Sequence, residues 1–262
     1  MDVLASRLSW RRLPWLVEVF SIGIGYGVYA VIRLYTPGQR TVADVHALEV
    51  IHFEKVVGIY HELALNRFIT GKTWLEIPAS YYYATLHFII TPLVLAWLFR
   101  RHQAIYAPLR SAIVIATAAA LVVYATWPLS PPRYVVAGTI DTVLAHPVAW
   151  AVNGHGVSGF VNEIAAMPSL HVGWAVWCAV AVSTALSSRW RYLAWLYPLG
   201  TTLVVVATAN HYLLDAVAGC AVVAVALQLC GVRFSGRVAP TVIAVPTSRG
   251  HKGLREELEE AV

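Results

Sequence analysis

Long apolar segments separated by shorter polar ones dominate the pattern of this chain. Six of them approach the roughly 20 apolar residues that a helix needs to span a membrane. The predicted spans are Leu13–Leu34, Ser80–Phe99, Leu109–Trp127, Ser169–Leu186, Tyr192–Thr208 and Leu213–Leu229. We therefore predict an all-α polytopic membrane protein, a six-transmembrane-helix bundle that forms one integral membrane domain over residues 1–262. Its core would cover residues 13–230, and the polar residues 231–262 would form a mobile cytoplasmic tail.

The segment between the first two predicted spans has a different pattern. Thr41–Lys72 mixes charged residues with apolar ones at helical spacing, which predicts a pair of interfacial amphipathic helices lying on the membrane. We interpret Glu54, His61 and Glu62 as a solvated face of this pair rather than as a lid over a site. The stretch Pro131–Ala166, rich in glycine, is expected to be an irregular or partly helical loop.

Composition supports a lipid environment. The chain is 58% hydrophobic and only 13% charged, about half the charged share of a typical soluble domain. The net charge of +5 does not indicate nucleic acid, because no basic stretch is interleaved with aromatic stacking residues. The three cysteines lie in apolar runs without a CxxC pair, so we expect neither a disulfide framework nor a metal site.

The distribution of arginine predicts the topology. Arg100 and Arg101 fall in one short loop, and Arg189 and Arg191 fall in another. The positive-inside rule places both loops, together with the N- and C-termini, in the cytoplasm. We expect a multi-pass protein of the plasma membrane if the host is bacterial, whereas in a eukaryote the same topology would place the extracytoplasmic side in a lumen.

Three polar segments then fall on the extracytoplasmic side: residues 127–134, 167–171 and 210–215. They are far apart in sequence, but six helices would bring them to one depth. They are therefore candidates for a shared site. An ionisable residue near the membrane edge is a functional candidate by default.

His211 and Asp215 are spaced i, i+4, which places them on one helical face. The carboxylate can accept a proton from one imidazole nitrogen and leave the other as a nucleophile or base. The structural alternative is that His211 anchors the interface and Asp215 complements the helix dipole.

The segment Pro168-Ser169-Leu170-His171 begins the fourth predicted span. The first amides of a helix suit an anion such as phosphate. Ser169 adds a hydroxyl donor, and His171 is placed to protonate a leaving oxygen. The alternative is a helix cap with an interfacial histidine.

Arg133 is the only lysine or arginine in the stretch Pro131–Ala166. A guanidinium can hold a phosphoryl group with two parallel hydrogen bonds. A contact with a lipid headgroup is the alternative.

Together these segments resemble the type 2 phosphatidic acid phosphatase superfamily, whose motifs are K-x6-R-P, P-S-G-H and S-R-x5-H-x3-D in this order. Residues 168–171 match the second motif with Leu170 in place of glycine, and His211 and Asp215 match the H-x3-D of the third. Arg133 is the best match to the arginine of the first. The resemblance covers roughly residues 50 to 230.

The departures from these motifs concern cations. Thr126 stands where the first motif has lysine, and Tyr134 stands where it has proline. Val204 and Val205 replace the serine and arginine of the third motif. The strings S-L-H-V-G-W, P-P-R and N-H-Y-L-L-D, and the stretch Tyr82 to Leu98, look like the inositol-phosphorylceramide synthase branch, which transfers a phosphoinositol headgroup between lipids.

The resemblance implies a membrane enzyme that cleaves or transfers the phosphoryl or phospho-headgroup of a lipid, with no required metal or cofactor. His211 would attack phosphorus and form a phosphohistidine. Asp215 would orient His211, and His171 would protonate the departing oxygen. The remaining site residues, which would hold the phosphoryl oxygens, are Arg133, Ser169 and Leu170. The implied partners are membrane lipids, among them a lipid phosphate substrate.

Two other classes of function compete with this interpretation. One is a catalytically silent lipid-binding scaffold or a transporter of the same fold. The other is a haem protein, which needs axial histidines. His87 alone lies within a predicted span, and the sequence shows no obvious partner for it at the same depth.

Overall fold

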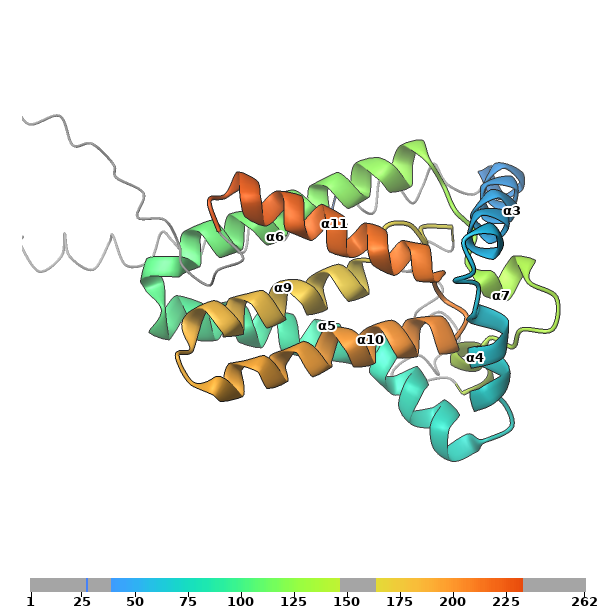
Figure 1. The fold of residues 1–262 in the computed structure, drawn as a ribbon, viewed down its shortest axis with the longest axis horizontal. Coiled ribbons are helices and arrows are strands. Elements are labelled where there is room, and N and C mark those ends of the chain that lie inside the picture. The colour runs from blue at the N-terminus through green and yellow to red at the C-terminus, as the bar shows by residue number, and fades with distance from the viewer. Residues whose placement is uncertain (1–26, 28–38, 147–163, 233–262) are drawn as a thin grey trace, which may run out of the picture.

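The structure is a computed structural model that describes residues 39–146 and 164–232, together with Gly27. Within these ranges the protein is helical and contains no β-strand (Figure 1). The helices are α3 (Arg40–Val56), α4 (Glu62–Ile69), α5 (Thr73–Arg101), α6 (Gln103–Thr126), α7 (Pro132–Val135), α8 (Thr142–Ala145), α9 (Leu170–Ala185), the 3₁₀ helix η3 (Arg189–Trp195), α10 (Leu196–Ala207) and α11 (Leu213–Leu229).

The helices α5 and α6 are long and apolar enough to cross a membrane, whereas α9 and α11 are shorter apolar helices. These four correspond to predicted spans. The prediction of the span Leu13–Leu34 and of the tail beyond Val232 lies outside the described residues. The all-helical prediction is confirmed for the described ranges, and the count of six spans stays a prediction.

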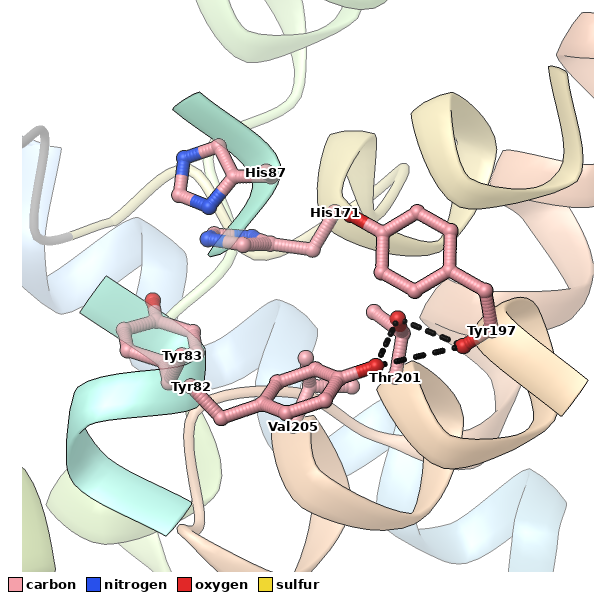
Figure 2. Close-up of a pocket in the computed structure, with 7 residues that line it drawn as sticks. All are labelled: Tyr82, Tyr83, His87, His171, Tyr197, Thr201 and Val205. Carbon is pink, nitrogen blue, oxygen red and sulfur yellow. Dashed lines mark hydrogen bonds between the residues drawn. The ribbon is translucent and has the colours of Figure 1, made fainter. Parts of the chain in front are cut away.

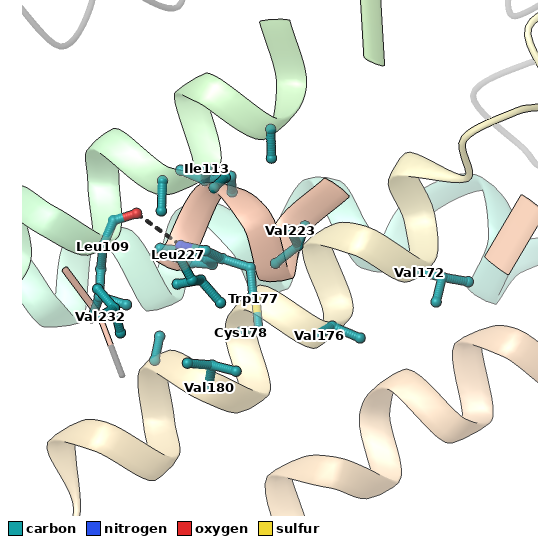
Figure 3. Packing of buried hydrophobic residues seen from close by; sticks show 14 of the residues in the cluster. Leu109, Ile113, Val172, Val176, Trp177, Cys178, Val180, Val223, Leu227 and Val232 are labelled. Atoms are coloured by element: carbon teal, nitrogen blue, oxygen red, sulfur yellow. Dashed lines mark hydrogen bonds between the residues drawn. The ribbon is translucent and has the colours of Figure 1, made fainter. Parts of the chain in front are cut away.

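The central helix of the bundle is α9, which packs against α5, α6, α10 and α11. Its apolar residues point in all directions because its surroundings are protein on nearly every side. Trp177 is fully buried, and its indole nitrogen donates to the Leu109 carbonyl of α6 at 2.8 Å (Figure 3). This bond satisfies the polar atom of the largest core side chain.

The N-terminal halves of α9 and α11 are in backbone contact. A Cβ at Gly219 would overlap the carbonyl oxygen of Ser169, and a Cβ at Gly173 would lie 3.3 Å from the Gly219 carbonyl oxygen. The amide of Ser169 also donates to the carbonyl of Asp215 at 2.9 Å. Small residues therefore set the distance between the two helices that carry most of the candidate site.

The fifth predicted span, Tyr192–Thr208, is divided in the structure. Its first residues belong to η3, and the α-helix α10 begins only at Leu196. Pro198 lies in the first turn of α10, where its missing N–H removes no helical hydrogen bond. Proline therefore fixes a later helix start than hydropathy alone predicts.

The predicted amphipathic pair is present as α3 and α4, which lie across one end of the bundle (Figure 1). Several apolar side chains of α3 are exposed, among them Val45 and Leu48, as suits a helix at a membrane surface. The interpretation of Glu54 and Glu62 as a solvated face is wrong, because both have 0% exposure. Each carboxylate accepts a backbone hydrogen bond from α11, which explains why it is tolerated in the interior.

The described part of the Pro131–Ala166 loop contains only the short helices α7 and α8. An isolated parallel bridge joins Leu129 to Ala165. The Leu129 amide donates to the Ile164 carbonyl at 2.8 Å, and the Ala166 amide donates to the Leu129 carbonyl at 3.2 Å. This bridge fixes the backbone just before α9.

Candidate active site

The three polar segments predicted to share a site meet at the end of the bundle that α3 and α4 cover. His211 follows α10, and Asp215 lies in the first turn of α11. Ser169 caps α9. The ring centroids of His171 and His211 are 5.5 Å apart, in an edge-to-face arrangement.

The hydrogen bonds of His211 fix its tautomer. Its Nδ1 lies 2.8 Å from the Ala166 carbonyl oxygen and 3.3 Å from Oδ2 of Asp215. A carbonyl oxygen can only accept, so Nδ1 carries the proton and donates. The lone pair of the neutral ring is therefore on Nε2, which is the arrangement that a nucleophilic histidine needs.

The turn after α10 presents this imidazole. Ala209 has a positive φ of 55°, which ends the helix in a left-handed residue. The amides of Asn210 and His211 then both donate to the Val205 carbonyl at 3.1 Å. The backbone of His211 is thereby held by α10, while its side chain is held by the segment before α9.

Asp215 has two roles. Its Oδ2 accepts from the Tyr212 amide at 2.9 Å, which caps α11, and the same oxygen lies next to the Nδ1 of His211. The carboxylate is fully buried, and its Oδ1 has no hydrogen-bond partner within the described ranges. A buried negative charge beside Nδ1 would stabilise the positive charge that His211 acquires on attack.

The surroundings of His211 keep it neutral. Burial lowers the pKa of His211 to about 4, and the positive charge of Arg133 acts in the same direction, while the hydrogen bond to Ala166 opposes them. At neutral pH the ring is therefore neutral, with its one proton on Nδ1, so Nε2 is available as a nucleophile.

Ser169 caps α9 through its side chain. Its Oγ accepts from the Val172 amide at 3.4 Å. The hydroxyl proton is not used in that contact, so it can still be donated. Leu170 is the first residue of α9, where amides have no helical acceptor. Ser169 and Leu170, two of the three residues predicted to hold phosphate, thus lie beside His171.

Arg133 comes close to the His211 segment through the backbone and the side chain. Its amide donates to the Ala209 carbonyl at 3.0 Å, and its Nη1 donates to Oδ1 of Asn210. Its Nε lies 3.1 Å from Oδ2 of Asp141. The structure therefore brings Arg133 to the site. Its guanidinium also contacts Asn210 and Asp141, which sequence analysis did not predict as its partners.

A family model for the PAP2 superfamily matches residues 48–229, which is more than half of the chain. The chain belongs to the PAP2 superfamily. No curated protein and no solved structure gives a significant match. Members of this superfamily are membrane-associated phosphatases and phosphotransferases that act on lipid phosphates. The resemblance stated from the motifs is thus confirmed at the level of the superfamily.

This PAP2 protein also has aromatic neighbours around His171 that sequence reasoning missed. The ring of Tyr83 stacks on His171 with a centroid distance of 4.5 Å, and His87 meets it edge-on at 4.2 Å. The sequence showed no obvious partner for His87 at its depth, and the structure places the ring of His171 beside it. His87 is one turn after Tyr83 on α5, a spacing that could have indicated one shared face.

A small pocket adjoins His171 between α5, α9 and α10 (Figure 2). The lining residues are Tyr82, Tyr83, His87, His171, Tyr197, Thr201 and Val205. The hydroxyl of Tyr82 lies 2.9 Å from that of Thr201 and 3.3 Å from the Tyr197 carbonyl oxygen, which it can reach as a donor. His171 lines this pocket, and its ring centroid is 5.5 Å from that of His211, which does not line it.

Among the residues that the structure describes, no group of three or more histidine, cysteine, aspartate or glutamate side chains is arranged to hold a metal ion. The polar side chains that the structure places at this candidate site are two histidines, a carboxylate, a capping hydroxyl and an arginine. All five are groups that the sequence motifs indicated.

Proposed function

We propose that this PAP2 superfamily protein is a membrane enzyme that cleaves or transfers the phosphoryl or phospho-headgroup of a lipid through a phosphohistidine at His211. The superfamily supports a phosphatase or phosphotransferase acting on lipid phosphates. The observation that carries the mechanism is the hydrogen bond from Nδ1 of His211 to the Ala166 carbonyl, because it leaves the Nε2 lone pair free.

The first step is displacement at phosphorus. Nε2 of His211 forms a bond to phosphorus, and the bond from phosphorus to the lipid oxygen breaks. His171, whose ring lies 5.5 Å from that of His211, gives a proton to the departing oxygen. Asp215 stabilises the positive charge that develops on His211. The hydroxyl of Ser169, the amide of Leu170 and the guanidinium of Arg133 hold the phosphoryl oxygens.

The second step releases the phosphoryl group. An oxygen nucleophile attacks phosphorus, gives its proton to His171 and breaks the bond to Nε2 of His211. Water as the nucleophile yields a phosphatase, and a lipid or polyol hydroxyl yields a transferase. We favour an inositolphosphotransferase-like activity because the motif strings resemble that branch.

The proposed setting is a six-helix bundle in the plasma membrane with both termini in the cytoplasm. The charge distribution of the loops supports this orientation. The site would then lie at the extracytoplasmic face, under the interfacial helices α3 and α4.

The test uses purified full-length protein in detergent, incubated with a panel of phospholipids and isoprenoid phosphates. Released phosphate and new lipid species are followed by mass spectrometry for the wild type, for His211→Ala and for His52→Ala, an exposed histidine of α3 as matched control. Turnover that is lost only in His211→Ala supports the proposal, and a new headgroup-bearing lipid identifies a transferase. Equal turnover in all three proteins excludes His211 as the nucleophile.

A silent scaffold has one specific observation in its favour, the engagement of the Arg133 guanidinium by Asn210 and Asp141. It predicts lipid binding by the wild type with no turnover of any panel member. Intact-protein mass spectrometry after brief exposure to substrate separates the two functions, because only an enzyme gains, in a His211-dependent manner, the mass of a phosphoryl group or of the whole phospho-headgroup.

A further inference from the structure

Three consecutive amides at the start of α11 each donate to a different carboxylate. The Tyr212 amide donates to Asp215 at 2.9 Å, as described above. The Leu213 amide donates to Oε1 of Glu62 at 2.9 Å, and the Leu214 amide donates to Oε1 of Glu54 at 2.7 Å. Glu54 is on α3 and Glu62 begins α4, so the interfacial helices hold the helix end that follows His211.

Within the described ranges, the other carboxyl oxygens of the two glutamates lack hydrogen-bond donors. Oε2 of Glu54 and Oε2 of Glu62 are buried and have no hydrogen-bond partner among the described residues. Two buried carboxylates side by side would leave both oxygens unsatisfied and would repel each other. One proton on either group removes both problems, because the protonated oxygen then donates to the other.

We propose that Glu54 and Glu62 share one proton and act as positioning residues that clamp the first turn of α11, and with it His211 and Asp215, to the interfacial helices. Their effect on turnover rests on the proposed function. Their effect on the stability of the fold does not, because the clamp joins α3, α4 and α11 whatever the site does.

Electrostatics supports the shared proton. Burial raises the pKa of Glu54 to about 8, and the neighbouring Glu62 adds to the rise, while the Leu214 amide opposes it. The buried Asp215 of α11 also raises it. The phenols of Tyr60, from the loop after α3, and of Tyr212 face the same acidic group, and both have pKa values raised by burial and by the two glutamates.

Cations lie at the edge of this group. The ammonium of Lys55 is 5.0 Å from the ring centroid of Tyr60, and Arg67 of α4 lowers the pKa of Tyr60. Both cationic residues are exposed. They interact with the phenol of Tyr60 rather than with the two carboxyl groups. The shared proton, rather than a nearby cation, therefore neutralises Glu54.

The sign of the pH effect follows from these pKa values. The pKa of Glu54 rises on folding from 4.5 to about 8. Its contribution to stability is therefore complete below pH 4.5 and is lost as the pH rises through about 8. Above that pH the pair carries two buried negative charges beside Asp215, and the clamp on α11 weakens.

The first arm of the test does not depend on catalysis. Glu54→Gln keeps an acceptor for the Leu214 amide and supplies a permanent N–H donor to Glu62. The thermal unfolding midpoint of the full-length protein in detergent is measured from pH 4.5 to above pH 8. We expect the wild type to lose stability progressively as the pH rises from 4.5 to about 8, with no further loss from this group above 8, and Glu54→Gln to show no such loss. Glu49→Gln, an exposed glutamate of the same helix, should behave as the wild type.

The second arm follows phosphate release or headgroup transfer against pH in the same proteins. We expect kcat of the wild type to fall about tenfold per pH unit above the pKa of Glu54 and kcat of Glu54→Gln to stay level, with KM similar in both. An alkaline fall that persists unchanged in Glu54→Gln in both arms overturns the proposal. Absence of turnover in the wild type contradicts only the proposed function. The pH dependence of the unfolding midpoint still shows whether Glu54 and Glu62 share a proton.

Discussion

His211 and Ala166 are joined by a hydrogen bond of 2.8 Å from the imidazole Nδ1 to the backbone carbonyl oxygen, across 45 positions of sequence. The same Nδ1 lies near the carboxylate of Asp215. One nitrogen thus has two acceptors, of which the nearer is uncharged. The orientation of the ring is therefore set by the backbone before α9, and the charge beside it is set by α11.

This division of roles predicts the effect of Asp215→Asn. The amide oxygen can still accept from Tyr212, and Ala166 still holds the tautomer of His211, so the fold and the ring orientation should persist. The charge that stabilises the imidazolium is lost, and kcat should fall by about 10²–10⁴. Steady-state kinetics of the purified variant measures this loss. Asp44→Asn, in α3, should retain activity, and equal activity of the two variants would contradict the role of Asp215.

The low pKa of His211 predicts an unusual acid limb. Because the proposed nucleophile must be neutral, the loss of kcat/KM that follows protonation of His211 should occur towards pH 4 rather than at 6.5. Folding lowers this pKa, so stability should also decrease as the pH falls from 6.5 towards 4, where the unfolded state binds more protons. A limb at 6.5 in the wild type would show that His211 is solvated.

Arg133 contributes to that low pKa through its positive charge. Arg133→Gln should therefore move the acid limb of kcat/KM to higher pH and, if Arg133 holds the phosphoryl oxygens as proposed, also lower kcat/KM. Arg67→Gln, an exposed cation on α4, should leave the limb in place. The pH profiles of the two variants, measured side by side, distinguish the local effect of Arg133 from a change in net charge.

Ser169 and Ser188 offer a matched pair of helix caps. Both side chains accept an amide hydrogen bond at a helix start, from Val172 and from Trp190. Each Ser→Ala change should destabilise the fold by about 1 kcal/mol. Only Ser169→Ala should also lower kcat/KM, by about 10²-fold, because in the proposed mechanism its hydroxyl holds a phosphoryl oxygen. If kcat/KM falls by a similar factor in Ser188→Ala, the loss in Ser169→Ala is explained by helix capping alone.

Gly219 tests the backbone contact between α9 and α11. A methyl group there would overlap the Ser169 carbonyl oxygen, so Gly219→Ala should lower the free energy of unfolding by about 1–3 kcal/mol. At Gly200 a Cβ would meet only the Tyr82 hydroxyl at 3.5 Å, an ordinary contact. Gly200→Ala should therefore be close to neutral in a thermal unfolding measurement. Tolerance of both changes would mean that the two helices can separate.

Short-range patterns in the sequence predicted the elements of this site, and long-range contacts set its details. The spacing of His211 and Asp215 and the Pro-Ser start of α9 are local features, so periodicity and capping rules located them. The burial of Glu54 depends on the Leu214 amide, 160 positions away. A charged residue on an amphipathic helix looks solvated until its partner is known, which is why this glutamate was misinterpreted.

The aromatic environment of His171 escaped prediction for the same reason. Tyr83 and His87 lie on α5, and only the packing of α5 against α9 brings them to the histidine. Hydropathy located α5 and α6 but missed their starts, because both helices begin before the predicted spans, at Thr73 and Gln103, whereas α10 begins after the predicted start of its span, at Leu196. There the proline in the first turn, rather than the apolar run, determines where the α-helix begins.

The glycine contact between α9 and α11 also restricts how the molecule can move. Because the two helices touch through their backbones, His171 on one and Asp215 on the other travel as a rigid body. Neither sliding nor parting of this pair can admit a bulky lipid without breaking the bond from the Ser169 amide to the Asp215 carbonyl. Motions that expose the histidines are therefore expected in α5, in α10 or in the interfacial helices, while His171 and Asp215 keep their mutual geometry.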